Sequence, residues 1–222
     1  MAPELERQLA AYHPCCEQEA VDRDVMLHFL RENTDAFTRE NLVAHFTASS
    51  WIVNSSRTHA LMAWHNLYRA WSWTGGHADG ETDLLSVALR EAREETGLVH
   101  VAPVFPEIFS LETLWVEGHE KRGKYVPCHL HLNVTYLLEA DAGDALRAKP
   151  DENSGVRWFM LDEAVEASTE EWMRARVYEK LNRTVPCSRV PRVSCISGAQ
   201  CPPDLVDIPY SVRSSSLTSE ES

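Results

Sequence analysis

The sequence predicts a mixed α/β domain, and three features of its patterning support this fold class. Residues 129–140, HLHLNVTYLLEA, alternate apolar and polar side chains, which is the period of a strand with one core face. Residues 83–96 carry leucines and alanines on one helical face and are followed by Gly97, a common helix C-terminus. Residues 51–53 and 60–65 are apolar, and the turn-forming NSSRTH separates them. Strands and helices therefore alternate along the chain, as in a sheet covered by helices.

The N-terminal region, up to about residue 43, is predicted to be helical. One apolar stripe at positions i, i+4, i+7 and i+8 is formed by Val21, Val25, His28 and Phe29. We expect this stripe to face the core. From the segment HFTASSWIVN onward the pattern changes to that of a β-strand.

The remaining elements follow in order along the chain. Residues 70–76, AWSWTGG, form a short strand that glycines end, and residues 103–116 are strand-like. Residues 156–160, VRWFM, form a last short strand. Residues 161–182 form a helical end, with one face expected to contain Trp172, Ala175, Val177 and Leu181.

Composition indicates one ordinary domain in a chain of 222 residues. The N-terminal sequence MAPELERQLAAY lacks a signal-peptide pattern, and no apolar run reaches the roughly 18 residues that a membrane span needs. We therefore expect a cytoplasmic protein with no membrane partner. The net charge of −13 argues against binding to a nucleic-acid duplex, because that affinity comes from clustered basic residues. A homodimer is left open.

The C-terminal segment, residues 186–222, is rich in proline and serine and poor in large apolar residues. Such a composition buries too little surface to offset the entropy of ordering, so we expect a disordered tail. The six cysteines of the chain show no zinc-ligand spacing.

The predicted helix 83–96 ends with an unusual concentration of carboxylates. Glu91, Glu94 and Glu95 are related by i, i+3 and i+4, so they project from one side of the last turns. Carboxylates at a helix C-terminus are unfavourable, because the helix dipole already places negative charge there. A solvated charged face is one interpretation. The other is a site for a hard divalent cation, which prefers such oxygen ligands.

The segment around this helix resembles the Nudix box, Gx5Ex7REUxEExGU, where U is a bulky aliphatic residue. Gly76 matches the first glycine, and the second half is matched by Arg90, Glu91, Glu94, Glu95, Gly97 and Leu98. Two positions depart from the pattern: Ala92 is smaller than the usual aliphatic residue, and Thr82 stands where the first glutamate is expected. The segments AHFTASSWIVN, WSWTGGHADG, HLHLNVTYLLEA and KPDENSGVRWF are also similar to a bacterial Nudix hydrolase subgroup.

The resemblance implies an α/β/α sandwich around a mixed sheet. The Nudix domain would occupy residues 41–185, after an N-terminal helical extension at residues 1–40. The implied activity is hydrolysis of a pyrophosphate linkage in a nucleoside diphosphate derivative, a small-molecule substrate. The implied ligands of Mg²⁺ or Mn²⁺ are Glu91, Glu94 and Glu95.

The resemblance also implies roles around the cation. Arg90 would orient one carboxylate, most simply Glu94, which lies at i+4 from it. Gly75 and Gly76 would let the backbone approach a metal or a phosphate. Glu152 lies in the loop KPDENSGVRW, where it is either a metal ligand or general base, or an ordinary turn residue. Glu94 and Glu95 are the alternative candidates for the base.

Four histidines and three tryptophans are further candidates. His129 and His131 share one face of their strand, which could line the substrate cleft or face solvent. His77 and His45 could each contact a phosphate. Aromatic side chains that could stack a base, but that fit a core equally well, are Trp64, Trp71 and Trp73.

Two rival functions remain at this level. One is a diphosphate isomerase on the same fold, for which Cys128 beside His129 would be the acid/base. The other is a nucleotide-sensing domain without catalysis, although such domains typically lose the box carboxylates that this chain keeps.

Overall fold

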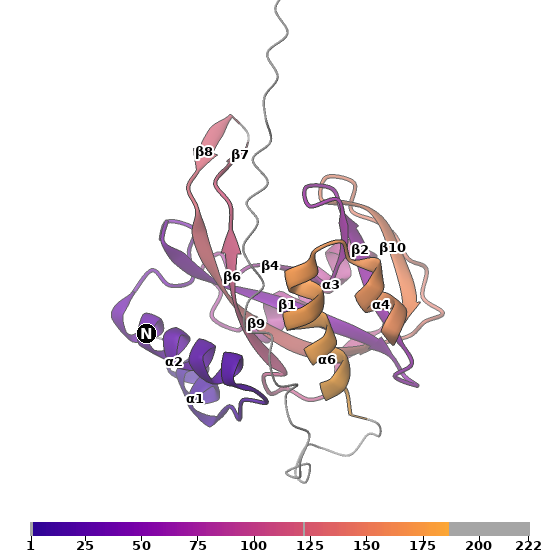
Figure 1. Ribbon diagram of the computed structural model, residues 1–222, viewed down its shortest axis with the longest axis horizontal. Coiled ribbons are helices and arrows are strands. Elements are labelled where there is room, and N and C mark those ends of the chain that lie inside the picture. Colours follow the sequence, from indigo (N-terminus) through magenta and orange to yellow (C-terminus); the bar gives the residue numbers. More distant parts are fainter. Residues whose placement is uncertain (1, 122, 187–222) are drawn as a thin grey trace, which may run out of the picture. The chain divides into compact units, whose positions relative to one another are not determined.

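The computed structural model describes residues 2–121 and 123–186, which form a mixed sheet with helices on both of its faces (Figure 1). The strands of the sheet are β1 (Ala44–Asn54), β2 (His59–His65), β3 (Ala70–Ser72), β4 (Thr74–His77), β5 (Val101–Pro103), β6 (Ser110–Val116), β9 (His129–Ala140) and β10 (Asn153–Met160). A separate hairpin of β7 (His119–Lys121) and β8 (Lys124–Val126) projects from the sheet. The helices are α1 (Pro3–Ala11), α2 (Glu17–Glu32), α3 (Leu84–Thr96), α4 (Leu161–Ala167), α5 (Glu171–Met173), a π-helical turn η1 (Arg174–Tyr178) and α6 (Glu179–Thr184).

The centre of the sheet is the parallel pair β1 and β9, in the strand order β10-β2-β1-β9-β5. The two strands pair from Ala44 opposite Leu130 to Asn54 opposite Ala140. The other strand pairs are antiparallel; β4 extends the β1 edge and β6 pairs with β9. The α/β/α arrangement predicted from the sequence is confirmed.

Side chains of β1 point alternately into two hydrophobic cores. Phe46, Ala48 and Ile52 belong to the core that includes residues of α1, α2 and α3. Trp51 and Val53 belong to the core beneath α4, η1 and α6. Both faces of this central strand are therefore covered, and its residues from Ala44 to Val53 are all buried.

Helix α3 begins and ends where the sequence predicts. The Asp83 side chain caps the N-terminus by accepting a hydrogen bond from the Ser86 amide at 3.2 Å. Gly97 follows the helix in a left-handed conformation, with φ of 74°. Val87, Ala88 and Ala92 pack in the core, so the small Ala92 fits closely under the sheet.

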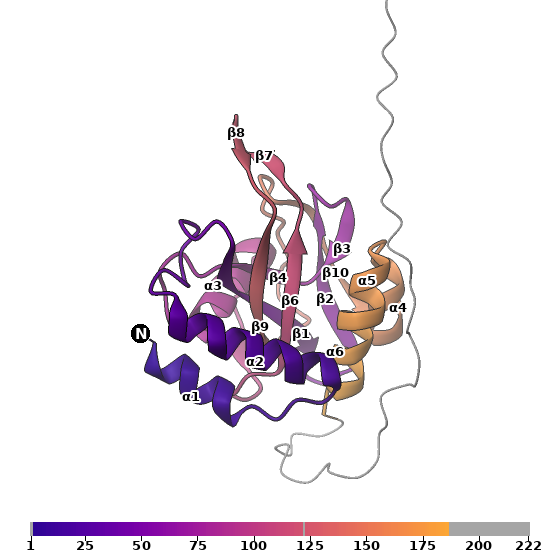
Figure 2. The same cartoon turned by 60° about the vertical axis from the view of Figure 1, so that its left-hand side comes forward.

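The apolar stripe expected in the N-terminal region is only partly correct: of its members, Phe29 packs against the core. Val21 and Val25 are exposed, and the buried side of α2 instead includes Glu19 and Met26. Apolar periodicity does not reveal the buried charge on this side: the carboxylate of Glu19 forms an ion pair with Lys180. Figure 2 shows α2 crossing in front of the sheet, where it packs on β6.

The face expected on the C-terminal helical segment is only partly correct. Val177 and Leu181 are buried, but Trp172 is exposed. The segment is not one helix: α4, α5, η1 and α6 follow one another, and the π-turn η1 shifts the later residues around the axis. Tyr178 thereby reaches the core and stacks on Trp51 at 5.5 Å between ring centroids.

A buried polar network crosses the face of the sheet that lies opposite α3. Lys180 of α6 contacts Glu112 of β6 at 3.0 Å and Glu19 of α2 at 3.2 Å. Glu112 accepts hydrogen bonds from Asn133 and Thr135 of β9. The face of residues 129–140 that alternation marks as polar is therefore interior, and its polar groups are satisfied within the protein.

Among the helices of the described residues, none combines the length and the apolar character that crossing a bilayer requires. The segment expected to be a disordered tail lies outside the described residues, apart from Pro186.

Candidate active site

The three carboxylates of α3 have different environments. Glu95 is 4% exposed, and one of its oxygens accepts a hydrogen bond from the Gly75 amide at 2.8 Å. The side chain of Glu91 is 13% exposed and that of Glu94 is 47% exposed. The last two turns of the helix thus present carboxylates from the protein interior out to solvent, beside strand β4.

The two glycines of β4 allow this strand to lie close to both α3 and β1. A Cβ atom on Gly76 would lie 2.5 Å from Cδ of Glu91, so only a glycine leaves room for that carboxylate. A Cβ on Gly75 would meet the backbone and hydroxyl of Ser49 on β1. The glycine pair therefore shapes a cradle between β1 and α3.

Burial makes the negative charge of two of these carboxylates costly. Burial raises the pKa of Glu95 to about 8, which the hydrogen bond from Gly75 opposes only in part. Burial also raises the pKa of Glu91, although Arg90 opposes the rise. Two desolvated carboxylates and one exposed carboxylate, held within one turn, are a donor set that fits a hard divalent cation. A cation bound there would offset the electrostatic cost of the site.

The i, i+4 spacing suggested that Arg90 pairs with Glu94, but in the structure it does not. Its guanidinium donates to the carboxylate of Glu91 at 3.1 Å. The exposed carboxylate of Glu94 is instead 3.3 Å from the ammonium of Lys149. Arg90 is thus placed to fix the carboxylate that lies against Gly76.

The loop before β10 brings Glu152 to the same place. Lys149 contacts Glu152 at 3.0 Å as well as Glu94 at 3.3 Å, so one ammonium bridges the helix and the loop. The Glu152 side chain is 45% exposed, and it reaches solvent on the side of Glu94. Sequence reasoning singled out Glu152 but missed Lys149, whose position before a Pro-Asp turn gives no sign of this pairing.

Asn153 is a second residue that the sequence did not reveal. Its fully buried side chain donates to the backbone carbonyl of Glu95 at 3.0 Å and accepts from the amide of Lys149 at 3.0 Å. The loop of Glu152 is therefore fastened to the end of α3 by a side chain that looks like an ordinary turn former in the sequence.

The four histidines come together on the other side of β4. His129 and His131 of β9 meet His45 of β1 and His77 of β4. The ring centroids are 4.8 to 5.2 Å apart between His45 and each of the other three, and between His131 and both His77 and His129. His45 and His129 are buried. Gly76 faces Glu91, and the next residue of the strand points to the opposite face of the sheet. The histidine cluster is therefore separate from the carboxylates.

The cysteine and the aromatic residues weighed from the sequence lie in different surroundings. Cys128 is exposed, and its sulfur accepts a hydrogen bond from the Gly118 amide at 3.2 Å, near the β7–β8 hairpin. Trp71 packs edge-on against Phe159, and Trp73 packs edge-on against Tyr178. Both tryptophans lie against the second core, as aromatic side chains in strands usually do.

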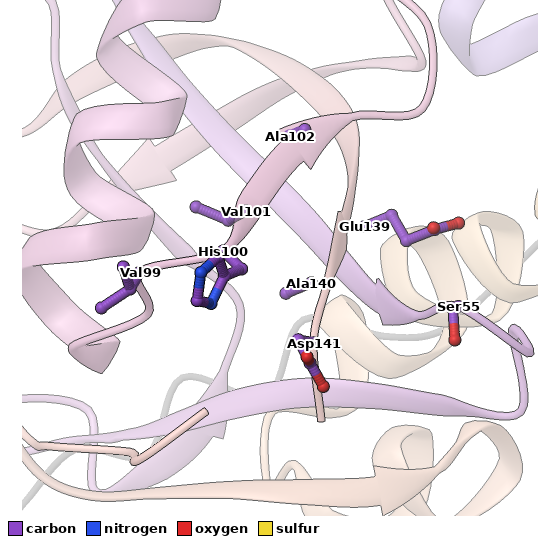
Figure 3. Close-up of a pocket in the computed structure, with 8 residues that line it drawn as sticks. All are labelled: Ser55, Val99, His100, Val101, Ala102, Glu139, Ala140 and Asp141. Carbon is purple, nitrogen blue, oxygen red and sulfur yellow. The ribbon is translucent and has the colours of Figure 1, made fainter. Parts of the chain in front are cut away.

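A hollow of about 470 Å³ lies elsewhere, at the end of the sheet where β5 meets β9 (Figure 3). It is lined by Ser55, Val99, His100, Val101, Ala102, Glu139, Ala140 and Asp141. None of these is a predicted site residue. The hollow is therefore distinct from the group of residues on α3, β4 and the Glu152 loop that the sequence singled out.

Comparison with known proteins identifies the family of this chain. The sequence model of the NUDIX domain matches residues 44–181, which is more than half of the chain and includes α3 and the Glu152 loop. The chain belongs to the NUDIX family. It is a Nudix pyrophosphohydrolase, and members of this family generally use divalent metal cations.

Individual relatives are also recognisable. The asymmetrical bis(5'-nucleosyl)-tetraphosphatase of Rattus norvegicus is 33% identical over 111 residues, which are 49% of this chain and 68% of the rat protein. Two solved structures, a binary complex of a C. elegans Ap4A hydrolase and a NUDIX-family hydrolase from Clostridium perfringens, are each 19% identical. Each covers 63% of this NUDIX chain, and this chain covers 93% and 97% of theirs, with TM-scores of 0.45 and 0.46.

Proposed function

We propose that this NUDIX protein hydrolyses a pyrophosphate linkage in a nucleoside diphosphate derivative, with Mg²⁺ or Mn²⁺ as cofactor. The observation that carries the proposal is the cradle in which Gly75 binds Glu95 and Gly76 leaves room for Glu91. Burying two carboxylates near a helix C-terminus destabilises a fold, and a bound cation would offset that cost.

In this proposal the cation is held by Glu91, Glu94 and Glu95. It supplies neutralisation of the phosphate charge, which otherwise repels a nucleophile. Arg90 holds the Glu91 carboxylate in its place against Gly76, through the contact of 3.1 Å. The amide of Gly75 fixes the orientation of Glu95. These residues thus determine where the cation and the diphosphate sit.

Glu152 is the proposed general base. It is on a loop that Asn153 fastens to α3, and Lys149 draws it toward Glu94. A carboxylate in that position can accept the proton of the attacking water, a role worth typically 10²–10⁴-fold in rate. Lys149 would turn its positive charge to the phosphates of the substrate when a cation takes its place beside Glu94.

The substrate class can be tested directly. A panel of nucleoside diphosphate derivatives is incubated with Mg²⁺ or Mn²⁺, and released phosphate is read after a coupled phosphatase. Bis(5'-nucleosyl) tetraphosphates belong first in the panel, because the rat relative carries that name. We expect turnover that stops in chelator and returns on adding the cation. No turnover of any diphosphate derivative would contradict the proposal.

We also propose that residues 41–185 are the catalytic domain and that residues 1–40 are an N-terminal addition to it. In support, α1 and α2 pack on the sheet through Leu5, Leu9 and Met26, while none of the candidate catalytic residues lies in them.

A further inference from the structure

Four histidine side chains from three strands converge at one end of the central sheet. Each offers a ring nitrogen, and the four nitrogens all lie within 4.8 Å of one another. Strand register explains the convergence: His45 of β1 is opposite His131 of β9, and His77 of β4 is opposite Thr47 of β1. Because paired residues share a face of the sheet, and so do residues two apart, the four rings point to the same side.

The spacing of the nitrogens matches a tetrahedral metal ion. With Zn–N bonds of about 2.0–2.1 Å, two nitrogens on one tetrahedral zinc are about 3.3 Å apart. The Nε2 atoms of His129 and His131 are 3.2 Å apart. The other nitrogen pairs lie within 4.8 Å, so they would have to close by at most about 1.5 Å to share the same ion.

In two of the rings, the nitrogen that points away from the cluster already contacts a backbone carbonyl, as is common for metal-bound imidazoles. The Nδ1 of His129 contacts the Pro127 carbonyl at 2.8 Å, and the Nδ1 of His45 contacts the Asn41 carbonyl at 3.1 Å. A carbonyl only accepts, so each Nδ1 carries the hydrogen and each Nε2 presents a lone pair to the cluster. The Nε2 of His45 is buried and has no hydrogen-bond partner among the described residues. Since Nδ1 of His45 is taken by the Asn41 carbonyl, this orphaned acceptor is the nitrogen that His45 can offer to the cluster.

A cation fits this cluster better than a phosphate does. An anion would need hydrogens on the nitrogens that face the cluster. In His45 and His129 the hydrogen of the neutral ring is on Nδ1, where a backbone carbonyl accepts it, so Nε2 can only accept. Neutral imidazoles are the form that binds metal. An all-nitrogen donor set suits zinc and similar transition metals, whereas Mg²⁺ and Mn²⁺ prefer oxygen ligands.

We propose that His45, His77, His129 and His131 form a zinc site, separate from the carboxylate site of α3. The ion would tie β1, β4 and β9 together directly behind the glycine pair. It would thereby fix the strand whose other face receives Glu91.

The test uses the full-length protein and zinc alone as the probe. Purified protein is freed of metal with a chelator, and binding of Zn²⁺ is measured by elemental analysis, by competition with a chelating dye and by the shift of melting temperature. We expect about one zinc ion per chain beyond any bound by the variant His45→Asn/His131→Asn. In that variant the affinity should fall by at least about 100-fold, since even losing a partner outside the ligand shell costs 10–100-fold.

Two controls separate this site from others. The variant His13→Asn/His28→Asn removes two exposed histidines and should bind zinc like the wild type. Glu91→Gln/Glu95→Gln should also keep its zinc, because the carboxylates lie on the other face of β4. Cobalt in the site should show the visible bands of a tetrahedral ion without thiolate charge transfer. Such a spectrum would exclude the cysteines as ligands, including Cys15 and Cys16, which are adjacent in the sequence.

Wild-type protein that takes up no zinc after chelation would overturn the proposal. So would equal affinity in the wild type and in His45→Asn/His131→Asn, provided that the variant keeps its circular dichroism spectrum. If that variant unfolds, the single substitution His131→Asn decides, since its ring is only partly buried. The result is independent of hydrolase activity, which is not measured in this experiment.

Discussion

The neighbouring glycines of β4 are expected to respond to the same substitution in opposite ways. In Gly76→Ala the new methyl group would lie 2.5 to 2.9 Å from the end of the Glu91 side chain. In Gly75→Ala it would lie 2.4 Å from the Ser49 hydroxyl, 2.7 Å from the Ala48 carbonyl oxygen and 2.8 Å from Cα of Ser49. A side-chain end can rotate away, but the backbone of a central strand cannot.

The magnitudes follow from those contacts. An ordinary carbon contact needs about 3.5–4.0 Å, so Glu91 must move by roughly 1 Å in Gly76→Ala. A shift of 1 Å in a positioning group can cost about 10²-fold in rate, while replacing glycine by alanine changes stability by at most about 1 kcal/mol. In Gly75→Ala, overpacking against β1 should cost about 1–3 kcal/mol, which is ~2–12 °C in melting temperature for a domain of this size.

Both variants are assayed for thermal unfolding without cation, for kcat, and for the concentration of Mn²⁺ that gives half-maximal rate. We expect Gly76→Ala to melt near the temperature of the wild type, with a kcat at least about 100-fold lower. The concentration of Mn²⁺ that gives half-maximal rate should be higher than for the wild type. Gly143→Ala is the matched control, because its methyl would meet the end of the Asp141 side chain, at 3.2 Å from Oδ1 and 3.9 Å from Cγ, in an exposed loop. A fully active Gly76→Ala would refute the cradle, and an unchanged melting temperature for Gly75→Ala would refute the packing argument.

Three further substitutions test the site and the interior. Glu94→Gln should lower turnover at least about 10³-fold and leave the fold intact, with Glu40→Gln as an active control; full activity would exclude Glu94 as a ligand. Glu152→Gln should lower kcat by about 10²–10⁴-fold with little change in KM if it is the base, and by almost nothing if it is a turn residue. Lys180→Met should cost about 3–5 kcal/mol, or ~6–20 °C, at pH 7, because it leaves buried carboxylates unpaired, while Lys124→Met should cost little.

The loss in Lys180→Met should depend on pH in a defined direction. Burial alone would raise the pKa of Glu19, but Lys180 and hydrogen bonds, including one from the Tyr12 hydroxyl, lower it overall. A carboxylate with a lowered folded pKa stabilises above its unfolded pKa of about 4.3, and that stability is lost as the pH falls through the folded pKa. Without Lys180, burial dominates and Glu19 takes up a proton readily. Melting curves of both proteins should therefore differ most at pH 7 and converge toward pH 4. A difference that is constant over this range would contradict a charged pair.

The sequence predicted the elements whose signals are local. Strand β9 occupies the predicted residues 129–140, and α3 begins after its Asp83 cap and ends at Gly97. Alternation and capping are properties of consecutive residues, so they can be recognised without the fold. The glutamates of the box lie on α3 for the same reason.

The sequence could not show what is decided by contacts between distant segments. Glu19 and Lys180 are 161 positions apart, and each alone looks like a solvated charge; only the fold buries them together. The apolar pattern of α2 therefore did not indicate that its buried side includes a carboxylate. Lys149 and Asn153 escaped notice in the same way, since their partners are on α3 and their own segment has the composition of a turn.

The position of Glu95 shows why the site depends on both its strand and its loop. Its carboxylate accepts from the amide of Gly75, and its backbone carbonyl accepts from Asn153. The glycine strand and the Glu152 loop are thus bound to one residue at the end of one helix, and a displacement of either must move the other. Asn153→Ala would break the link to the loop without touching a carboxylate. It should lower kcat through Glu152 while the requirement for cation stays close to that of the wild type, and a large change in that requirement would show that the loop instead positions the carboxylates of α3.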